Sequence, residues 1–176
     1  MRIHTSAIRL KPGDIYDLRV SPQRLKIAIG GYAAEPALDL ECSFCCAAHQ
    51  RPENNAVAFI GEEHSIMLEG SVRQSENRFS ADEWGDCFIV KLGDIPDDIT
   101  CLLFYGYFTL PSTQDKLSGS LKEHFLRLTD QDNGKEILRV DLPEQCPINS
   151  SITYARLSRA GGNDGWHFQF MQFTSS

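Results

Sequence analysis

Apolar and polar residues alternate with a period of two along much of the chain, which is typical of strands that bury one face. The alternation is clearest from residue 37 to residue 47, where Asp39, Glu41 and Ser43 share one face and leucine, cysteine and phenylalanine share the other. Further alternating or apolar runs, separated by turn residues, cover Ile15–Val20, Leu25–Tyr32, Ala56–Ile60, Ser65–Leu68, Cys87–Leu92, Ile99–Leu110, Phe125–Thr129, Glu136–Leu142, Ser151–Leu157 and His167–Phe173. About nine to ten short strands predict an all-β chain folded as a two-sheet β-sandwich.

The segments between these runs predict turns and loops. Asp132-Asn133-Gly134 is the strongest hairpin turn, because Asn-Gly pairs adopt the positive φ angles that tight turns need. Residues 71–86 are polar and lack helical periodicity, so they predict a long loop, and residues 112–123 have room for one helical turn. No repeat or linker divides the 176 residues, and this length fits a single domain over residues 1–176.

Composition and charge narrow the classes of function. The net charge is −7 and no run of lysine and arginine interrupts the acidic background, which disfavours nucleic acid as a partner. No apolar run reaches the ~18 residues of a membrane span, so we expect no direct membrane insertion. The opening residues lack a secretory hydrophobic segment, and the six cysteines fit free thiols in a reducing compartment, which together predict a cytoplasmic protein.

Cysteine and histidine patterns do not predict a zinc site or a catalytic site. The spacings of Cys42, Cys45, Cys46 and His49 suit zinc, but a continuous strand places Cys42 and Cys45 on opposite faces. Cys42 and Cys46 share the parity of Phe44 and are expected in the core. The five histidines are scattered and none lies in a nucleophile or metal motif, so we expect a protein without enzymatic activity.

Carboxylates are the best candidates for a binding site. Asp is depleted in strands, so the position of Asp39 within an apolar alternation needs a physical reason. Ca²⁺ takes about six to eight oxygen ligands, usually from several loops, and a second acidic set closes the polar stretch before residue 87. The candidate metal ligands are Asp39, Glu41, Asp82, Glu83 and Asp86. Two separate, solvated acidic patches are the alternative.

Several short motifs occur in a characteristic order along nearly the whole chain. They are Leu10-Lys11-Pro12-Gly13, Leu25–Tyr32, Leu38-Asp39-Leu40-Glu41, Val140-Asp141-Leu142, Arg159 and Trp166-His167-Phe168. Their order and spacing resemble those of the tellurium-resistance TerD-type family of bacterial stress-response proteins. Members of that family have an opening Leu-x-Lys-Gly, an apolar strand ending in Gly-x-Trp, a core Asp-Leu-Asp, a late Tyr-Asp-Leu, a Tyr-Arg and a final Trp-x-Phe.

The resemblance implies a calcium-binding β-sandwich, and it also exposes departures from the family pattern. Members have Gly-Asp-Asn where this chain has Gly70-Ser71-Val72, and Gly-Asp-Asp-Glu where it has Glu83-Trp84-Gly85-Asp86. Asp39 is retained, Glu41 is a conservative change, and Asp86 falls at the last acidic position of the loop motif. Fewer carboxylates predict a calcium site that is either of low affinity or absent.

The resemblance further implies a role in resistance to tellurite or to chemical damage. We therefore expect a non-enzymatic stress-response protein that binds protein partners and has a degenerate calcium-site region at one end of the sandwich. The alternative is a metal-free interaction or scaffold protein of a membrane-associated stress or phage-defence complex.

Overall fold

A computed structural model describes residues 8–18, 23–32, 41–50, 56–60, 66–76, 83–109, 125–141, 151–160 and 165–175. These residues form thirteen strands and two short 3-10 turns. The strands are β1 (Ile8–Arg9), β2 (Ile15–Asp17), β3 (Arg24–Tyr32), β4 (Glu41–Gln50), β5 (Ala56–Ile60), β6 (Ile66–Met67), β7 (Val72–Glu76), β8 (Glu83–Lys91), β9 (Ile99–Thr109), β10 (Phe125–Asp130), β11 (Glu136–Asp141), β12 (Ser151–Arg159) and β13 (Trp166–Ser175). The 3-10 turns are η1 (Leu68–Gly70) and η2 (Leu92–Asp94).

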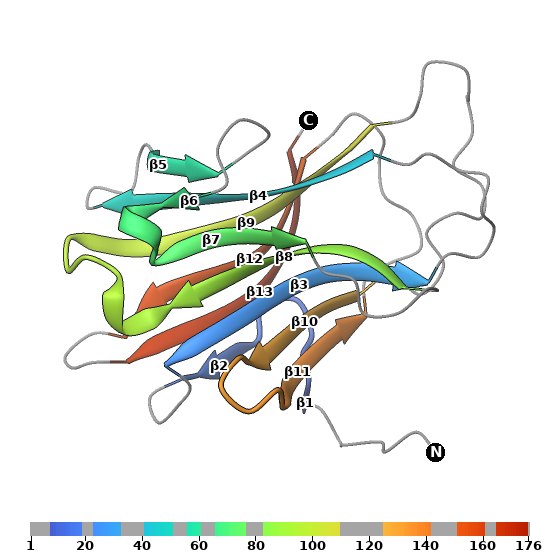
Figure 1. The fold of residues 1–176 in the computed structure, drawn as a ribbon. Coiled ribbons are helices and arrows are strands. Elements are labelled where there is room, and N and C mark those ends of the chain that lie inside the picture. Colours follow the sequence, from blue (N-terminus) through green and yellow to red (C-terminus); the bar gives the residue numbers. More distant parts are fainter. Residues whose placement is uncertain are drawn as a thin grey trace.

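The strands form two sheets that pack face to face, as the alternating pattern predicts (Figure 1). One sheet has seven strands in the order β1-β11-β10-β3-β8-β7-β6, and the other has six in the order β2-β13-β12-β9-β4-β5. Apart from the parallel pair β1–β11, neighbouring strands run antiparallel. The all-β, two-sheet prediction is thus confirmed. In the described part of the chain, no helix is both long and apolar enough to cross a membrane.

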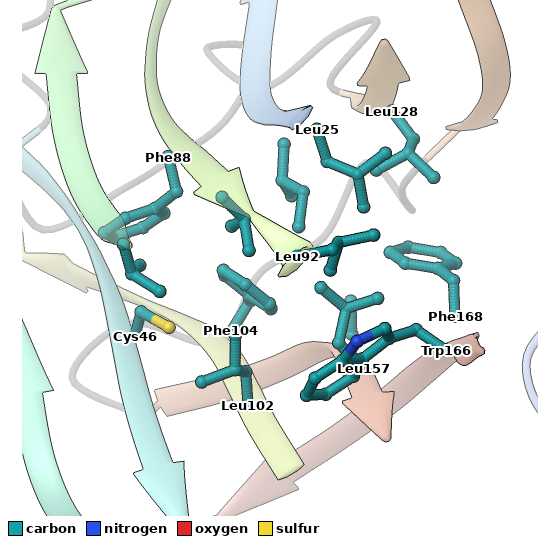
Figure 2. Packing of buried hydrophobic residues seen from close by; sticks show 14 of the residues in the cluster. Leu25, Cys46, Phe88, Leu92, Leu102, Phe104, Leu128, Leu157, Trp166 and Phe168 are labelled. Carbon is teal, nitrogen blue, oxygen red and sulfur yellow. The ribbon is translucent and has the colours of Figure 1, made fainter. Parts of the chain in front are cut away.

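The core lies between the sheets and is built largely from alternate residues along strands of both sheets. Phe88 of the seven-stranded sheet and Phe104 of the six-stranded sheet meet across this space, with ring centroids 5.6 Å apart and planes inclined by 59° (Figure 2). Both rings are fully buried. The inward positions of the seven-stranded sheet include Leu25, Ile27, Val72, Phe88, Val90, Leu126, Leu128, Leu138 and Val140.

The predicted hairpin at Asp132-Asn133-Gly134 joins β10 and β11. Gly134 has a φ angle of +72°, which only glycine adopts at low cost, and its N–H donates to the carbonyl of Asp130 at 2.8 Å. The side-chain oxygens of Asp130 and Asn133 each accept a backbone N–H two residues further on. The turn chemistry therefore sets the register of these two strands.

The loop predicted over residues 71–86 is wrong at both of its ends. Residues 72–76 form β7, and β8 begins at Glu83 rather than at Cys87. The segment reads as a loop because β7 is short and four of its five residues are polar, although Val72 is buried in the core. Likewise β4 extends to Gln50, where a loop was expected from His49. The helical turn expected in residues 112–123 lies outside the described residues.

Candidate functional site

The predicted acidic site falls at one end of the sandwich, where β4 begins with Glu41 and β8 begins with Glu83. Figure 1 shows both strand beginnings at the same end, beside the end of β3. We call this end, with Glu41, Glu83 and the nearby Asp86, the acidic end. Asp39 and Asp82, the other two predicted ligands, lie outside the described residues. The fold thus brings two strands from different sheets, each with an acidic first residue, to one end of the molecule.

The register of the strands decides which of these positions share a sheet face. In β8, Asp86 has the parity of the core residues Phe88 and Val90, whereas Glu83 has the opposite parity. In β4, Glu41 has the opposite parity to Cys46, which lies in the core. Alternation therefore assigns Asp86 alone, of the three, to the inward-facing set of positions.

Sequence reasoning missed one acidic position, Glu76, because it treated the segment as a loop. Glu76 is the last residue of β7 and pairs directly with Asp86 of β8. Side chains directly opposite on antiparallel strands are close enough for like charges to repel, at a cost of about 0.2–1 kcal/mol. A divalent cation would relieve that repulsion, and carboxylate oxygens are the donors that Ca²⁺ prefers. The donor chemistry therefore fits a hard cation.

The remaining ligands of such a site are not evident in the described part of the chain. Among the described residues, no three His, Cys, Asp or Glu side chains gather into a group that could hold a metal. The two positions interpreted above as lost family ligands, Ser71 and Val72, lie elsewhere. Ser71 follows η1 and Val72 begins β7, away from the acidic end (Figure 1). Val72 is buried in the core, and Ser71 Oγ donates to the carbonyl of Leu68 at 2.9 Å. Both residues have structural roles there.

Cys45 and Cys46 lie on opposite faces of a continuous strand, as the alternation predicts, while the side chain of Cys42 lies outside the described part of β4. Cys46 lies in the core, near Phe88 and Phe104 (Figure 2). Cys45 is buried on the other face, where it pairs with Tyr105 of β9. Burial, with smaller contributions from Cys101 and Cys45, raises the pKa of Cys46 well above its usual value. Cys46 is thus held as a neutral thiol, which is a poor metal ligand and a poor nucleophile.

Arg159, the last residue of β12, lies at the opposite end of the sandwich, which we call the closed end. Its Nε donates to the carbonyl of Ile99 at 2.8 Å, and its Nη2 donates to the carbonyls of Ile95 and Pro96 at 3.0 and 2.9 Å. The guanidinium carbon also lies 4.6 Å from the ring centroid of Trp166. One side chain therefore satisfies three carbonyls of the segment that crosses from one sheet to the other.

The other motifs of the family pattern also have structural roles in this fold. Trp166 and Phe168 are buried in the core from β13 (Figure 2). The opening turn is fastened to the same strand, because the N–H of Gly13 donates to the carbonyl of Phe170 at 2.9 Å. Gly13 has a φ angle of +90°, which explains the glycine at this position.

Comparison with known proteins agrees with this architecture. The TerD domain model matches residues 7–172. Tellurium resistance protein TerD of an Alcaligenes species is 25% identical over 167 residues, covering 90% of this chain and 85% of that protein. The TerD protein of Serratia marcescens is 22% identical over 166 residues, with the same coverage of 90% and 85%.

Solved structures show the same fold. A crystal structure of a homologue of telluride resistance protein TerD, from Streptomyces coelicolor A3(2), superposes with a TM-score of 0.63. The identity is 9%, and the superposition covers 86% of this chain and 89% of that one. With a family model that matches nearly the whole chain, the conclusion is that this protein belongs to the TerD domain family.

Proposed function

We propose that this chain is a non-enzymatic binding protein of a tellurium-resistance type of stress response, and that its acidic end binds a divalent cation with low affinity. Two relatives are named tellurium resistance proteins, which supports the first part. The observation that carries the second part is the direct pairing of Asp86 with Glu76, near the end where β4 and β8 begin with Glu41 and Glu83.

Low affinity follows from the arrangement of the carboxylates rather than from Ser71 and Val72. Alternation divides Glu83 and Asp86 between the two faces of β8, so the strand itself presents only Asp86 beside Glu76. Calcium sites with few charged, rigid ligands have dissociation constants of about 10⁻⁴ to 10⁻³ M. The bound ion would then relieve repulsion between opposed carboxylates without organising a catalytic centre.

A calcium titration followed by thermal unfolding tests this function. At a calcium concentration equal to Kd, binding to the folded state adds about 0.4 kcal/mol to the free energy of unfolding. For a domain of this size the melting temperature rises by roughly 1–2 °C. We expect this shift at about millimolar Ca²⁺, and we expect Asp86→Asn to abolish it. Asp97→Asn, an exposed carboxylate at the closed end, is the matched control and keeps the shift.

Each outcome of the titration separates the two candidate functions. A shift of many degrees at micromolar Ca²⁺ would show a strong, complete site and would contradict the low-affinity proposal. If the melting temperature does not rise even at about ten times millimolar calcium, and Asp86→Asn unfolds as the parent does, the proposed cation site is rejected. The metal-free interaction or scaffold protein would then be the better description, and the partner proteins recovered with the tagged chain would define it.

A further inference from the structure

The outer face of the seven-stranded sheet gathers basic residues that lie far apart in the sequence. Arg24 of β3 pairs directly with Lys91 of β8. In the next outward row, Lys26 of β3 pairs with Ile89 of β8, which pairs with Arg73 of β7. We call Arg24, Lys26, Arg73 and Lys91 the basic face.

Alternation and burial place these side chains on the outside of the sandwich. Their neighbours along the strands, Leu25, Val72 and Val90, are buried in the core, so the basic residues have the outward parity. Arg24 and Arg73 are exposed, while Lys26 and Lys91 are half-buried. Two strand spacings and one step of two residues bring the four charges into an area of about 10 Å by 7 Å.

This concentration of positive charge is unusual for the chain as a whole, which has a net charge of −7. Like charges directly opposite on neighbouring strands destabilise a sheet, so the pairing of Arg24 with Lys91 carries a stability cost. Asp132 offsets part of it through an ion pair with Arg24 at 2.5 Å. The exposed carboxylates of Glu69 and Asp94 lie in the turns η1 and η2 that flank the face, and not on its strands.

Apolar residues accompany the cations on this face. Ile66 of the edge strand β6 pairs with Arg73 and is 58% exposed. Ile89 lies in the same outward row, between Lys26 and Arg73. The row therefore alternates basic and aliphatic residues across four neighbouring strands, a combination that suits a surface with charged groups outside and hydrocarbon beneath.

We propose that the basic face docks on an anionic lipid surface. Phosphate and carboxylate headgroups meet Arg24, Arg73 and the two lysines, and Ile66 lies against the boundary with the acyl chains. Single-stranded nucleic acid is a poorer fit, because the outward row has isoleucines where base stacking needs aromatic rings. This docking goes beyond the proposed function and uses a different surface from the acidic end.

Vesicle co-sedimentation of the full chain tests the docking. The probes are vesicles of phosphatidylcholine alone and vesicles of phosphatidylcholine and phosphatidylserine in equal amounts. We expect binding only to the second kind, and release in 1 M salt, where the screening length falls to about 3 Å. The variant Arg73→Glu/Lys91→Glu binds at least about tenfold more weakly, since each basic residue near the surface contributes about 1 kcal/mol, or roughly fivefold.

Two further variants separate docking from general charge effects and from misfolding. Lys11→Glu/Lys135→Glu makes the same change of charge at two exposed turns off the basic face, and it should bind as the parent does. Ile66→Ser leaves the charge unchanged and should weaken binding severalfold. Its effect also keeps the test informative if the charge-reversed variant fails to fold, which circular dichroism would reveal.

Three results would overturn the proposal. The first is absence of binding of the parent chain to the phosphatidylserine vesicles. The second is equal binding by the basic-face variant and its matched control. The third is tighter binding to single-stranded or duplex oligonucleotides that compete with the vesicles, which would assign the face to nucleic acid. None of these results bears on the calcium titration, because the basic-face variants leave Asp86 unchanged and Asp86→Asn leaves the basic face unchanged.

Discussion

At the closed end, one arginine of the six-stranded sheet bonds to three backbone carbonyls of the segment that leads from β8 into β9, whereas at the acidic end β4 and β8 begin with acidic residues and Asp86 is the register partner of Glu76. At the closed end, the guanidinium of Arg159 also lies over the ring of Trp166. At the acidic end, two acidic residues, Asp86 and Glu76, are direct register partners on neighbouring strands. The first arrangement stabilises the fold, and we expect the second to cost stability unless a cation or partner binds.

This difference gives the family pattern a physical meaning. Arg159, Trp166 and Phe168 match the family pattern and have structural roles. Arg159 bonds to backbone carbonyls at the closed end, and Trp166 and Phe168 fill the core. Acidic positions can change without unfolding the chain, since charged residues at strand ends do not build the core. The fold can therefore persist in a member whose cation site has weakened. Four experiments test this contrast between the ends.

Arg159→Ala should have the largest effect of the four. The substitution leaves the carbonyls of Ile95, Pro96 and Ile99 without their charged donor and removes the contact with Trp166. We expect a loss of about 3 kcal/mol in the free energy of unfolding, measured by denaturant titration. Arg159→Lys should recover only part of it, because one ammonium cannot reproduce the planar fork. A loss below about 0.5 kcal/mol, as at ordinary surface positions, would show that the closed end is not held by this residue.

A matched pair of glycine substitutions tests whether the sandwich is loosely packed toward its acidic end. A Cβ atom on Gly106 of β9 would lie 2.6 Å from Cε2 of Tyr154, a ring that is 1% exposed. Gly106→Ala should therefore cost about 1–3 kcal/mol through overpacking. At Gly93, in η2, the nearest atom is the end of the Gln23 side chain at 3.2 Å, which can move.

The control substitution should have the opposite sign. Gly93→Ala restricts the unfolded chain and should be neutral or stabilising by up to about 1 kcal/mol. Thermal unfolding of both variants gives the comparison. If Gly106→Ala were as stable as the parent, the β9–β12 layer would be able to yield, and the two ends would differ in packing as well as in charge.

The alternation of apolar residues was enough to predict the fold. The arrangement of charged residues could not be predicted, because it depends on which strands pair and in which register. Strand β9 and the hairpin at Gly134 follow from local sequence, because burial period and turn chemistry are local properties. Strand β7 was missed because four of its five residues are polar. The opposition of Asp86 and Glu76 depends on strand pairing. The same holds for the basic face, whose members are separated by up to 67 positions, from Arg24 to Lys91.

The next smaller effect is a pH dependence of stability that arises from the thiol of Cys46, in the core near Phe88 and Phe104. Burial raises the pKa of Cys46 above its usual 9.0, so the folded state holds this proton more tightly than the unfolded state does. The stabilisation is complete below pH 9 and falls as pH rises toward the folded value, by up to about 1.4 kcal/mol per pH unit. Burial also raises the pKa of Tyr105 to about 12, which acts in the same direction at still higher pH.

Denaturant titrations between neutral and alkaline pH measure this loss. Cys46→Ala should lower the stability at neutral pH, because it leaves a small cavity, but its stability should fall less steeply above pH 9. Equal slopes for the parent and the variant would mean that Cys46 does not ionise on unfolding, or that other groups control the alkaline transition.

Asp86→Asn should have the smallest effect, and its sign distinguishes the acidic end from the closed end. Without divalent cations, removing one of two opposed charges should raise the free energy of unfolding by about 0.2–1 kcal/mol. Added calcium should reverse the order, because the parent gains from the bound ion and the variant does not. The measurement is a pair of thermal unfolding series, in EDTA and in about millimolar Ca²⁺. Glu76→Gln should behave as Asp86→Asn does, and the double variant should gain less than the sum of the two, because the repulsion can be removed only once. Destabilisation by either single substitution in EDTA would mean that the carboxylate has a hydrogen-bonding role in the folded state, and the acidic end would then resemble the closed end in being built for stability.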